Sequence, residues 1–317
     1  MSGGSSTAAA NPRARSAALR WLAACCAMAA FVLAHAQGEP AVEETILAVP
    51  VKVRDLFRKE IAQDITVTVF EIPGRASYPL LVLNHGRPAN DAGRGKMGRV
   101  RFAQAASYFA SLGFSVWVPT RVGYGVSGTE EDPEYTGPCQ KRDFRSGFDV
   151  SSAQVLQVIE HAKRRADIDR TRVVVAGQSF GGATSIAVAA RNPDGVVASI
   201  NFAGGSGGNP ETRPGEPCLP RWLEALFGEY GKTSRIPTLW VYTENDRYFG
   251  PHHTKTWFEA FKAGGGAGEF VLLPAFGNDG HALFTRGFEI WRPIVGRFLD
   301  TVKAHAAAPI PPAPAIR

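Results

Sequence analysis

The chain has 317 residues, of which 44% are hydrophobic and 20% are charged, and its formal net charge is +6. This is an ordinary globular composition that can bury a large core. Three of the arginines lie in an N-terminal segment that we expect to be removed, which leaves a charge of +3. So small a net positive charge gives no indication of binding to nucleic acid or to an anionic membrane.

The first 36 residues have the pattern of a secretory signal peptide. Arginines at positions 13, 15 and 20 precede an apolar run over 21–33, which is too short to span a bilayer. Ala34 and Ala36 supply the small residues that a signal peptidase reads, so we expect cleavage after Ala36. The mature protein would then be periplasmic or secreted, without stable membrane insertion. An uncleaved anchor and a lipoprotein site at Cys25 are the alternatives.

Strand and helix patterns alternate after this segment. Residues 47–53 and 65–72 alternate apolar and polar positions, which predicts an antiparallel pair with one exposed face. Short apolar runs predict strands covered on both faces, at 80–83, 114–119, 172–176, 196–202, 239–242 and 270–273. Helical patterns cover 100–112, 150–166, 179–190, 220–230, 252–263 and 288–302.

This alternation predicts an α/β fold with a doubly wound, mostly parallel, twisted sheet of about eight strands and helices on both faces. No internal repeat or central linker is present, so we expect one domain over 37–303. The Ala/Pro-rich residues 304–317 are expected to form a disordered tail. In sheets of this kind the functional site lies at the carboxyl ends of the strands.

Two connections are unusually long, 121–149 and 204–220, and loops of such length are usually functional or disordered. Each contains one cysteine of the mature chain, Cys139 or Cys218. Two cysteines in an exported chain predict one disulfide, which would tie the two loops together. Two unpaired thiols are the alternative.

The sequence around Ser179 predicts a nucleophile. Gly177, Ser179 and Gly181 form a G-x-S-x-G motif between an apolar strand and a helical run of small residues. A nucleophile on a sharp strand-to-helix turn needs small neighbours, because the backbone is strained and the helix packs closely.

A serine hydroxyl needs a general base, and the base needs an orienting carboxylate. His281 follows the last apolar run, and Asp246 follows the run before it, so both are expected near the carboxyl edge of the sheet. The order Ser, Asp, His along the chain fits such a triad. Glu244 and Asp279 are rival carboxylates, but Asp279 is only two residues from His281, which is poor geometry for facing its ring.

Two backbone amides are expected to bind the oxyanion of the reaction. One is that of Phe180, directly after the nucleophile. The other is that of Arg87, in the loop after residues 80–83. His85, in the same loop, is expected to shape the turn rather than to act as a base.

With these features the chain resembles the α/β-hydrolase superfamily over nearly all of its mature length. The resemblance rests on His85-Gly86, the motif at Gly177–Gly181, Asp246 and His281, in family order, and on the glycine-rich residues 121–128. It is most similar to dienelactone-hydrolase-type and related secreted esterases. Dienelactone hydrolases use cysteine where this chain has Ser179, which favours ordinary ester hydrolysis over lactone specificity.

The resemblance implies a serine hydrolase that cleaves small-molecule carboxylic esters through an acyl-enzyme. It implies no metal and no organic cofactor, and the sequence contains no metal-ligand cluster or phosphate-binding loop motif. A peptidase of the same fold is the main alternative, although many such enzymes add a large further domain. A non-catalytic binding protein is a third possibility. The side chain of Arg87 is a candidate contact for an anionic substrate group.

Overall fold

The computed structural model describes residues 1, 3–4, 41–88 and 90–304. The chain divides into two units, Met1–Ala41 and Val42–Arg317, and the fold below is that of the second unit. The predicted signal cleavage site and the tail from residue 305 onward lie outside the described residues. Among the residues that are described, no helix is long and apolar enough to cross a membrane.

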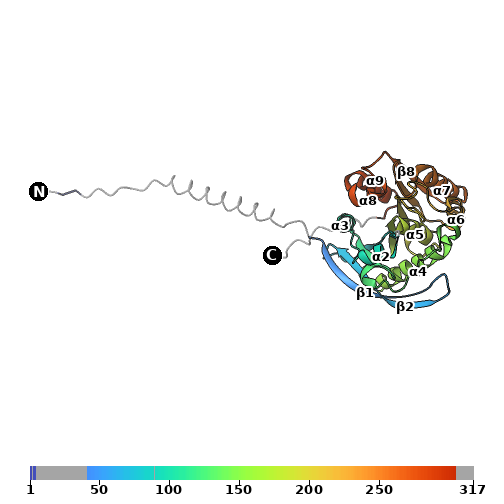
Figure 1. Cartoon of the computed structure of the whole chain (residues 1–317). Coiled ribbons are helices and arrows are strands. Elements are labelled where there is room, and N and C mark those ends of the chain that lie inside the picture. The colour runs from blue at the N-terminus through green and yellow to red at the C-terminus, as the bar shows by residue number, and fades with distance from the viewer. Residues whose placement is uncertain (2, 5–40, 89, 305–317) are drawn as a thin grey trace. The chain divides into compact units, whose positions relative to one another are not determined.

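Within the described residues, eight strands form one sheet in the order β1-β2-β4-β3-β5-β6-β7-β8 (Figure 1). Strand β2 pairs antiparallel with both β1 and β4, and all the other neighbouring strands pair in parallel. The strands are β1 (Glu43–Arg54), β2 (Glu60–Glu71), β3 (Tyr78–Asn84), β4 (Ser115–Thr120), β5 (Ile168–Gln178), β6 (Val196–Phe202), β7 (Thr238–Thr243) and β8 (Gly268–Leu273). The predicted sheet is confirmed, including its strand number and its antiparallel edge pair.

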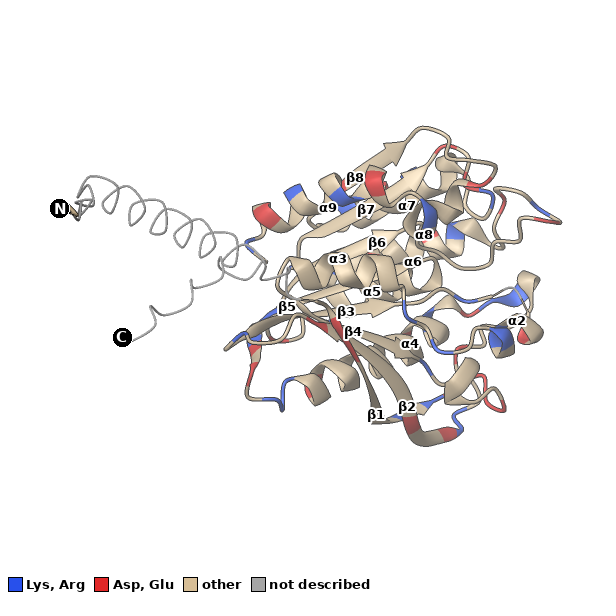
Figure 2. Ribbon diagram, turned by 90° about the vertical axis from the view of Figure 1, so that its left-hand side faces the viewer, with Lys and Arg blue, Asp and Glu red and all other residues tan. Residues whose placement is uncertain are grey.

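Helices cover both faces of the sheet (Figure 2). Alternate residues of β3 point to opposite faces, so Leu81 and Leu83 pack with α3 and α9, whereas Leu80 and Val82 pack with α4. The helices are α2 (Asp91–Lys96), α3 (Ala103–Ser111), α4 (Phe144–Ala162), α5 (Phe180–Ala189), α6 (Pro220–Thr233), α7 (Pro251–Ala263), α8 (Leu283–Arg286) and α9 (Phe288–Thr301). Three short 3-10 turns are η1 (Gly125–Ser127), η2 (Cys139–Lys141) and η3 (Gly280–Ala282).

The structure differs from the predicted elements at the end of the first long loop. Helix α4 begins at Phe144, within the segment that the sequence predicts as loop up to residue 149. Asp143 caps this helix, because its side chain accepts a hydrogen bond from the Ser146 amide at 3.1 Å. The short helices α2 and α8 were not predicted. At the C-terminal end, Ala304 is buried, and its amide donates to the Leu299 carbonyl at 3.0 Å.

The disulfide predicted between Cys139 and Cys218 is confirmed. Cys139 lies in the connection that precedes α4, and Cys218 lies just before α6. The bridge therefore joins the two long connections near the carboxyl ends of β4 and β6, where the site described below is built.

Candidate active site

Ser179 occupies a strained turn between β5 and α5. Its backbone angles are φ 59° and ψ −126°, in a region that residues with side chains rarely adopt. Neighbouring glycines make the turn possible: a β-carbon at Gly177 would lie 2.3 Å from the Gly181 carbonyl oxygen, and one at Gly181 would lie 2.4 Å from the Asn84 oxygen. The residue types of the motif are thus required by backbone contacts. Ser179 itself is 8% exposed.

His281 and Asp246 form a buried pair. Nδ1 of His281 lies 2.9 Å from Oδ2 and 3.1 Å from Oδ1 of Asp246. Oδ1 also accepts hydrogen bonds from the amides of Tyr248 and Phe249, at 2.8 and 3.0 Å. These bonds hold the carboxylate in place, and the Tyr248 ring stacks on the imidazole with ring centroids 4.1 Å apart. The ring of His281 is therefore held at Nδ1 by the Asp246 carboxylate and on one face by the Tyr248 ring.

The two rival carboxylates occupy other places. Glu244 is exposed, and no contact of its side chain with His281 occurs within the described chain. Asp279 accepts hydrogen bonds from the amides of His281 and Arg247, both at 3.0 Å. It therefore shapes the turn that carries His281 and does not face its ring.

A cavity of about 430 Å³ is lined by both Ser179 and His281. This volume is typical of a site for a small organic molecule. Apolar side chains of Met97, Val100 and Phe102 form part of its wall. Arginines 87, 99 and 101 also line it, whereas no aspartate or glutamate is among its lining residues in the described chain.

The sequence predicts that the backbone amides of Phe180 and Arg87 lie beside Ser179. Phe180 is the first residue of α5, so its N–H has no carbonyl partner one turn earlier in the helix. The loop after β3 approaches closely, because a β-carbon at Gly86 would lie 3.0 Å from Cβ of Ser179. This close approach brings the loop that contains Arg87 against the serine. The binding of an oxyanion by these two amides remains a prediction.

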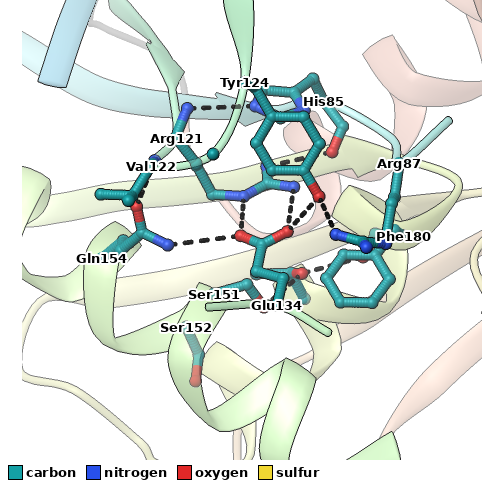
Figure 3. Close-up of polar contacts among 12 residues, drawn as sticks. His85, Arg87, Arg121, Val122, Tyr124, Glu134, Ser151, Ser152, Gln154 and Phe180 are labelled. Carbon is teal, nitrogen blue, oxygen red and sulfur yellow. Dashed lines mark hydrogen bonds and ion pairs between the residues drawn. The ribbon is translucent and has the colours of Figure 1, made fainter. Parts of the chain in front are cut away.

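The side chain of Arg87 belongs to a buried polar network (Figure 3). Its guanidinium makes a bidentate ion pair with Asp132, at 2.7 and 2.6 Å, and donates to the Tyr124 hydroxyl at 3.0 Å. Tyr124 donates in turn to Glu134 at 2.6 Å. Most of the hydrogen-bonding capacity of this arginine is therefore used within the protein.

The centre of the network is the ion pair of Arg121 and Glu134, both fully buried, with Nε and Oε1 2.6 Å apart. Arg121 also donates to the His85 carbonyl at 3.0 Å, and its amide donates to Nε2 of His85 at 3.1 Å. Burial and the nearby Arg121 charge hold the pKa of His85 well below its usual range. His85 is thus a neutral residue that joins the loop after β3 to the loop after β4, in agreement with its predicted structural role.

Sequence reasoning missed this network and also Tyr248. Glu134 and Asp132 lie in a loop whose composition gives no periodicity, so nothing indicated that Glu134 is buried and that Asp132 is partly buried. Tyr248 could have been noticed as an aromatic residue two positions after the predicted carboxylate Asp246.

A family model and a curated protein match part of this chain. The family model described as "Serine aminopeptidase, S33" matches residues 94–247, which include Ser179 and Asp246. Protein bem46 of Schizosaccharomyces pombe is 28% identical over 182 residues, or 55% of this chain. The chain spans about half (54%) of the length of that curated relative.

Solved structures of several hydrolases are similar to this fold. A Klebsiella pneumoniae protein described as a dienelactone hydrolase has a TM-score of 0.55 at 15% identity, covering 82% of this chain and 100% of that chain. The acylaminoacyl peptidase of Pyrococcus horikoshii has a TM-score of 0.55 at 15% identity, covering 83% and 43%. An acetyl xylan esterase from Paenibacillus sp. R4 has a TM-score of 0.53 at 15% identity, covering 85% and 90%. At these identities the likeness concerns the fold.

We expect Glu134→Ala to lower the free energy of unfolding by about 3–5 kcal/mol, because it leaves the buried guanidinium of Arg121 without a counter-charge. Urea denaturation followed by tryptophan fluorescence measures this. As a control, Glu229→Ala breaks the exposed ion pair with Arg145 and should cost less than about 1 kcal/mol. Equal losses in the two variants would contradict the role assigned to the buried pair.

Proposed function

Because the chain is a serine hydrolase of the α/β-hydrolase superfamily, we propose that it hydrolyses carboxylic esters of small molecules through an acyl-enzyme on Ser179. One observation carries the proposal. Ser179, at its strained turn, and His281, which is paired with the buried Asp246, line the same cavity. A hydroxyl, an imidazole and an orienting carboxylate are the groups that acyl transfer requires.

In the proposed reaction, Oγ of Ser179 attacks the ester carbonyl carbon while Nε2 of His281 takes its proton. Asp246 accepts the Nδ1–H bond and stabilises the imidazolium, and the amides of Phe180 and Arg87 donate to the oxyanion. The carbon–oxygen bond to the alcohol then breaks, and the alcohol leaves with the proton from His281. Water, deprotonated by His281, attacks the acyl-enzyme, releases the acid and restores the serine hydroxyl.

The lining of the cavity favours esters over peptides with a free amino terminus. An ammonium group buried in the site would need a carboxylate partner, and the lining within the described chain contains none. Arg87 is paired with Asp132, and Arg99 and Arg101 share the single carboxylate of Glu44; both carboxylates lie outside the lining. The three arginines of the wall thus outnumber their carboxylate partners, and the remaining positive charge would repel an ammonium group.

Hydrolysis of short peptides or aminoacyl amides is the second candidate, since the catalytic groups would be the same. The description of the matching family model and the likeness to an acylaminoacyl peptidase favour it. Substrate acceptance distinguishes the two functions.

We expect p-nitrophenyl acetate and butyrate to be turned over, and aminoacyl p-nitroanilides to be turned over poorly or not at all. Release of p-nitrophenol or p-nitroaniline gives kcat/KM for each compound. A preparation of Ser179→Ala corrects for spontaneous hydrolysis and for contaminating esterases. Turnover of the anilides alone would overturn the esterase proposal.

Among variants of the proposed triad, Ser179→Ala and His281→Ala should lower kcat by about 10⁴-fold or more, and Asp246→Ala by somewhat less. Glu244→Ala, which alters an exposed carboxylate on the same loop, should retain wild-type turnover. A fluorophosphonate probe should label the wild type and leave Ser179→Ala unlabelled. If the wild type is never labelled at Ser179, the protein is a binding protein; a loss of activity only in Glu244→Ala would show that the acid is misassigned.

We also propose that the protein is exported, to the periplasm or beyond the cell. The pattern of residues 1–36 and the disulfide between Cys139 and Cys218 support this, because such bonds persist in oxidising compartments. N-terminal sequencing of the protein recovered from outside the cytoplasm should begin at Gln37. Recovery of an uncleaved N-terminus, or of a start at a lipid-modified Cys25, would contradict cleavage after Ala36, and recovery only from the cytoplasm would contradict export.

A further inference from the structure

A second cavity, of about 70 Å³, meets the larger one at Ser179. Both cavities are lined by Arg87, Ser179 and Tyr248, but His281 lines only the larger cavity and Phe180 only the smaller one. Ser179 therefore borders both cavities, whereas Phe180, whose amide is one of the two proposed to bind the oxyanion, borders only the small cavity and the proposed general base borders only the large one.

The positions of these groups distinguish the two parts of an ester. The alcohol oxygen must receive its proton from His281 when it leaves, so the alcohol must lie on the side that His281 lines. The acyl group remains on Ser179 and extends to the other side. On this reasoning the large cavity takes the alcohol and the small cavity takes the acyl group, which must be short.

The small cavity carries an uncompensated positive charge. Arg142 lines it and donates to the Thr136 hydroxyl at 2.8 Å, but its buried Nε has no hydrogen-bond partner, and no carboxylate pairs with it among the described residues. Burial and the nearby charges of Arg87 and Arg213 lower the pKa of Arg142. No aspartate or glutamate lines this cavity within the described chain.

A glycine-rich segment forms another part of the wall of this cavity. Gly205, Ser206, Gly207 and Gly208 line it, and the amide of Gly205 donates to the Ser179 carbonyl at 3.3 Å. Side chains are excluded at two of these positions, because a β-carbon at Gly205 would lie 2.9 Å from the Phe249 ring and one at Gly208 would lie 2.7 Å from the Tyr248 carbonyl oxygen. The segment 205–208 is thus held close to Ser179 by a hydrogen bond and by the absence of side chains at its glycines.

The disulfide joins this wall to the segment that carries Arg142. Cys139 lies three residues before Arg142. Its partner Cys218 donates its amide to the Gly207 carbonyl at 3.0 Å, and Arg213 donates to its sulfur at 2.9 Å. The cavity is therefore a built site whose cationic side and backbone side are covalently connected.

We infer that this cavity is an acyl subsite for a short acyl group ending in a carboxylate, as in a half-ester of malonate or succinate. An anionic end group would supply the counter-charge that Arg142 lacks, and charge-assisted hydrogen bonds to a guanidinium are short, directional and strong. The inference rests on the proposed ester hydrolysis and adds the class of substrate.

The test compares monobenzyl succinate with benzyl 4-methylpentanoate, a neutral ester of nearly the same shape. The ratio of their kcat/KM values should be at least about 30 in favour of the half-ester, and Arg142→Met should reduce this ratio by about 10- to 100-fold, the factor expected for one hydrogen bond to a charged group. Arg145→Met, which removes an exposed arginine three residues away, is the matched control and should leave the ratio unchanged. A ratio near 1, or one that Arg142→Met does not alter, would overturn the inference while the esterase proposal stands.

Binding separates this inference from the proposed function. Calorimetry with monobenzyl succinate and Ser179→Ala should detect binding that weakens about 10- to 100-fold when Arg142→Met is added. If no ester is turned over but this binding difference is found, the subsite is supported and the esterase proposal fails. Equal binding to the single and the double variant would overturn the subsite, whatever the turnover. Thermal denaturation confirms that each variant is folded.

Discussion

The turn between β5 and α5 holds the Ser179 backbone at a positive φ, which costs on the order of 1–3 kcal/mol for a residue with a side chain. Such strain persists only when the surroundings enforce it. Here β5 is paired on both sides, with β3 and β6, and α5 packs so closely that the carbonyls of Asn84 and Gly177 touch its first turn. The same close contacts bring the loop after β3 against the serine. The positions of the proposed nucleophile and of both neighbouring amides therefore depend on one packing arrangement.

Charge is distributed unequally around this turn. Arg121 forms a fully buried ion pair with Glu134 (Figure 3), and Arg87 forms a partly buried one with Asp132, so each of these arginines faces a carboxylate. A buried charge needs such a partner, because transfer out of water is costly. Arg142, in contrast, lines a cavity that has no aspartate or glutamate among its lining residues in the described part of the chain. The contrast suggests that the network is structural and that the partner of Arg142 comes from outside the protein.

Much of the fold could be predicted, because buried strands and amphipathic helices leave regular patterns in the sequence. The strands and the larger helices lie where the apolar runs indicate, and the start of α4 was missed because Asp143 and Ser146 act as a helix cap inside a loop-like composition. At the site, the prediction named Asp246 and His281 from their places after successive strands, and the structure brings their side chains into contact. Glu134 and Arg142 could not be found in this way, since their roles depend on neighbours far away in the chain.

What the sequence determined by itself is what short segments encode: the strand and helix order, the small residues around Ser179, and the placing of polar residues just after strands. These features follow from local periodicity and from the steric limits of single residues. The tertiary structure decided which distant side chains meet: that Arg121 is neutralised by Glu134, that no carboxylate of the described residues pairs with Arg142, and that the Cys139–Cys218 disulfide joins two segments of one cavity wall. Electrostatic compensation and cavity shape depend on distances between segments that are far apart in the chain, and only the folded arrangement defines those distances.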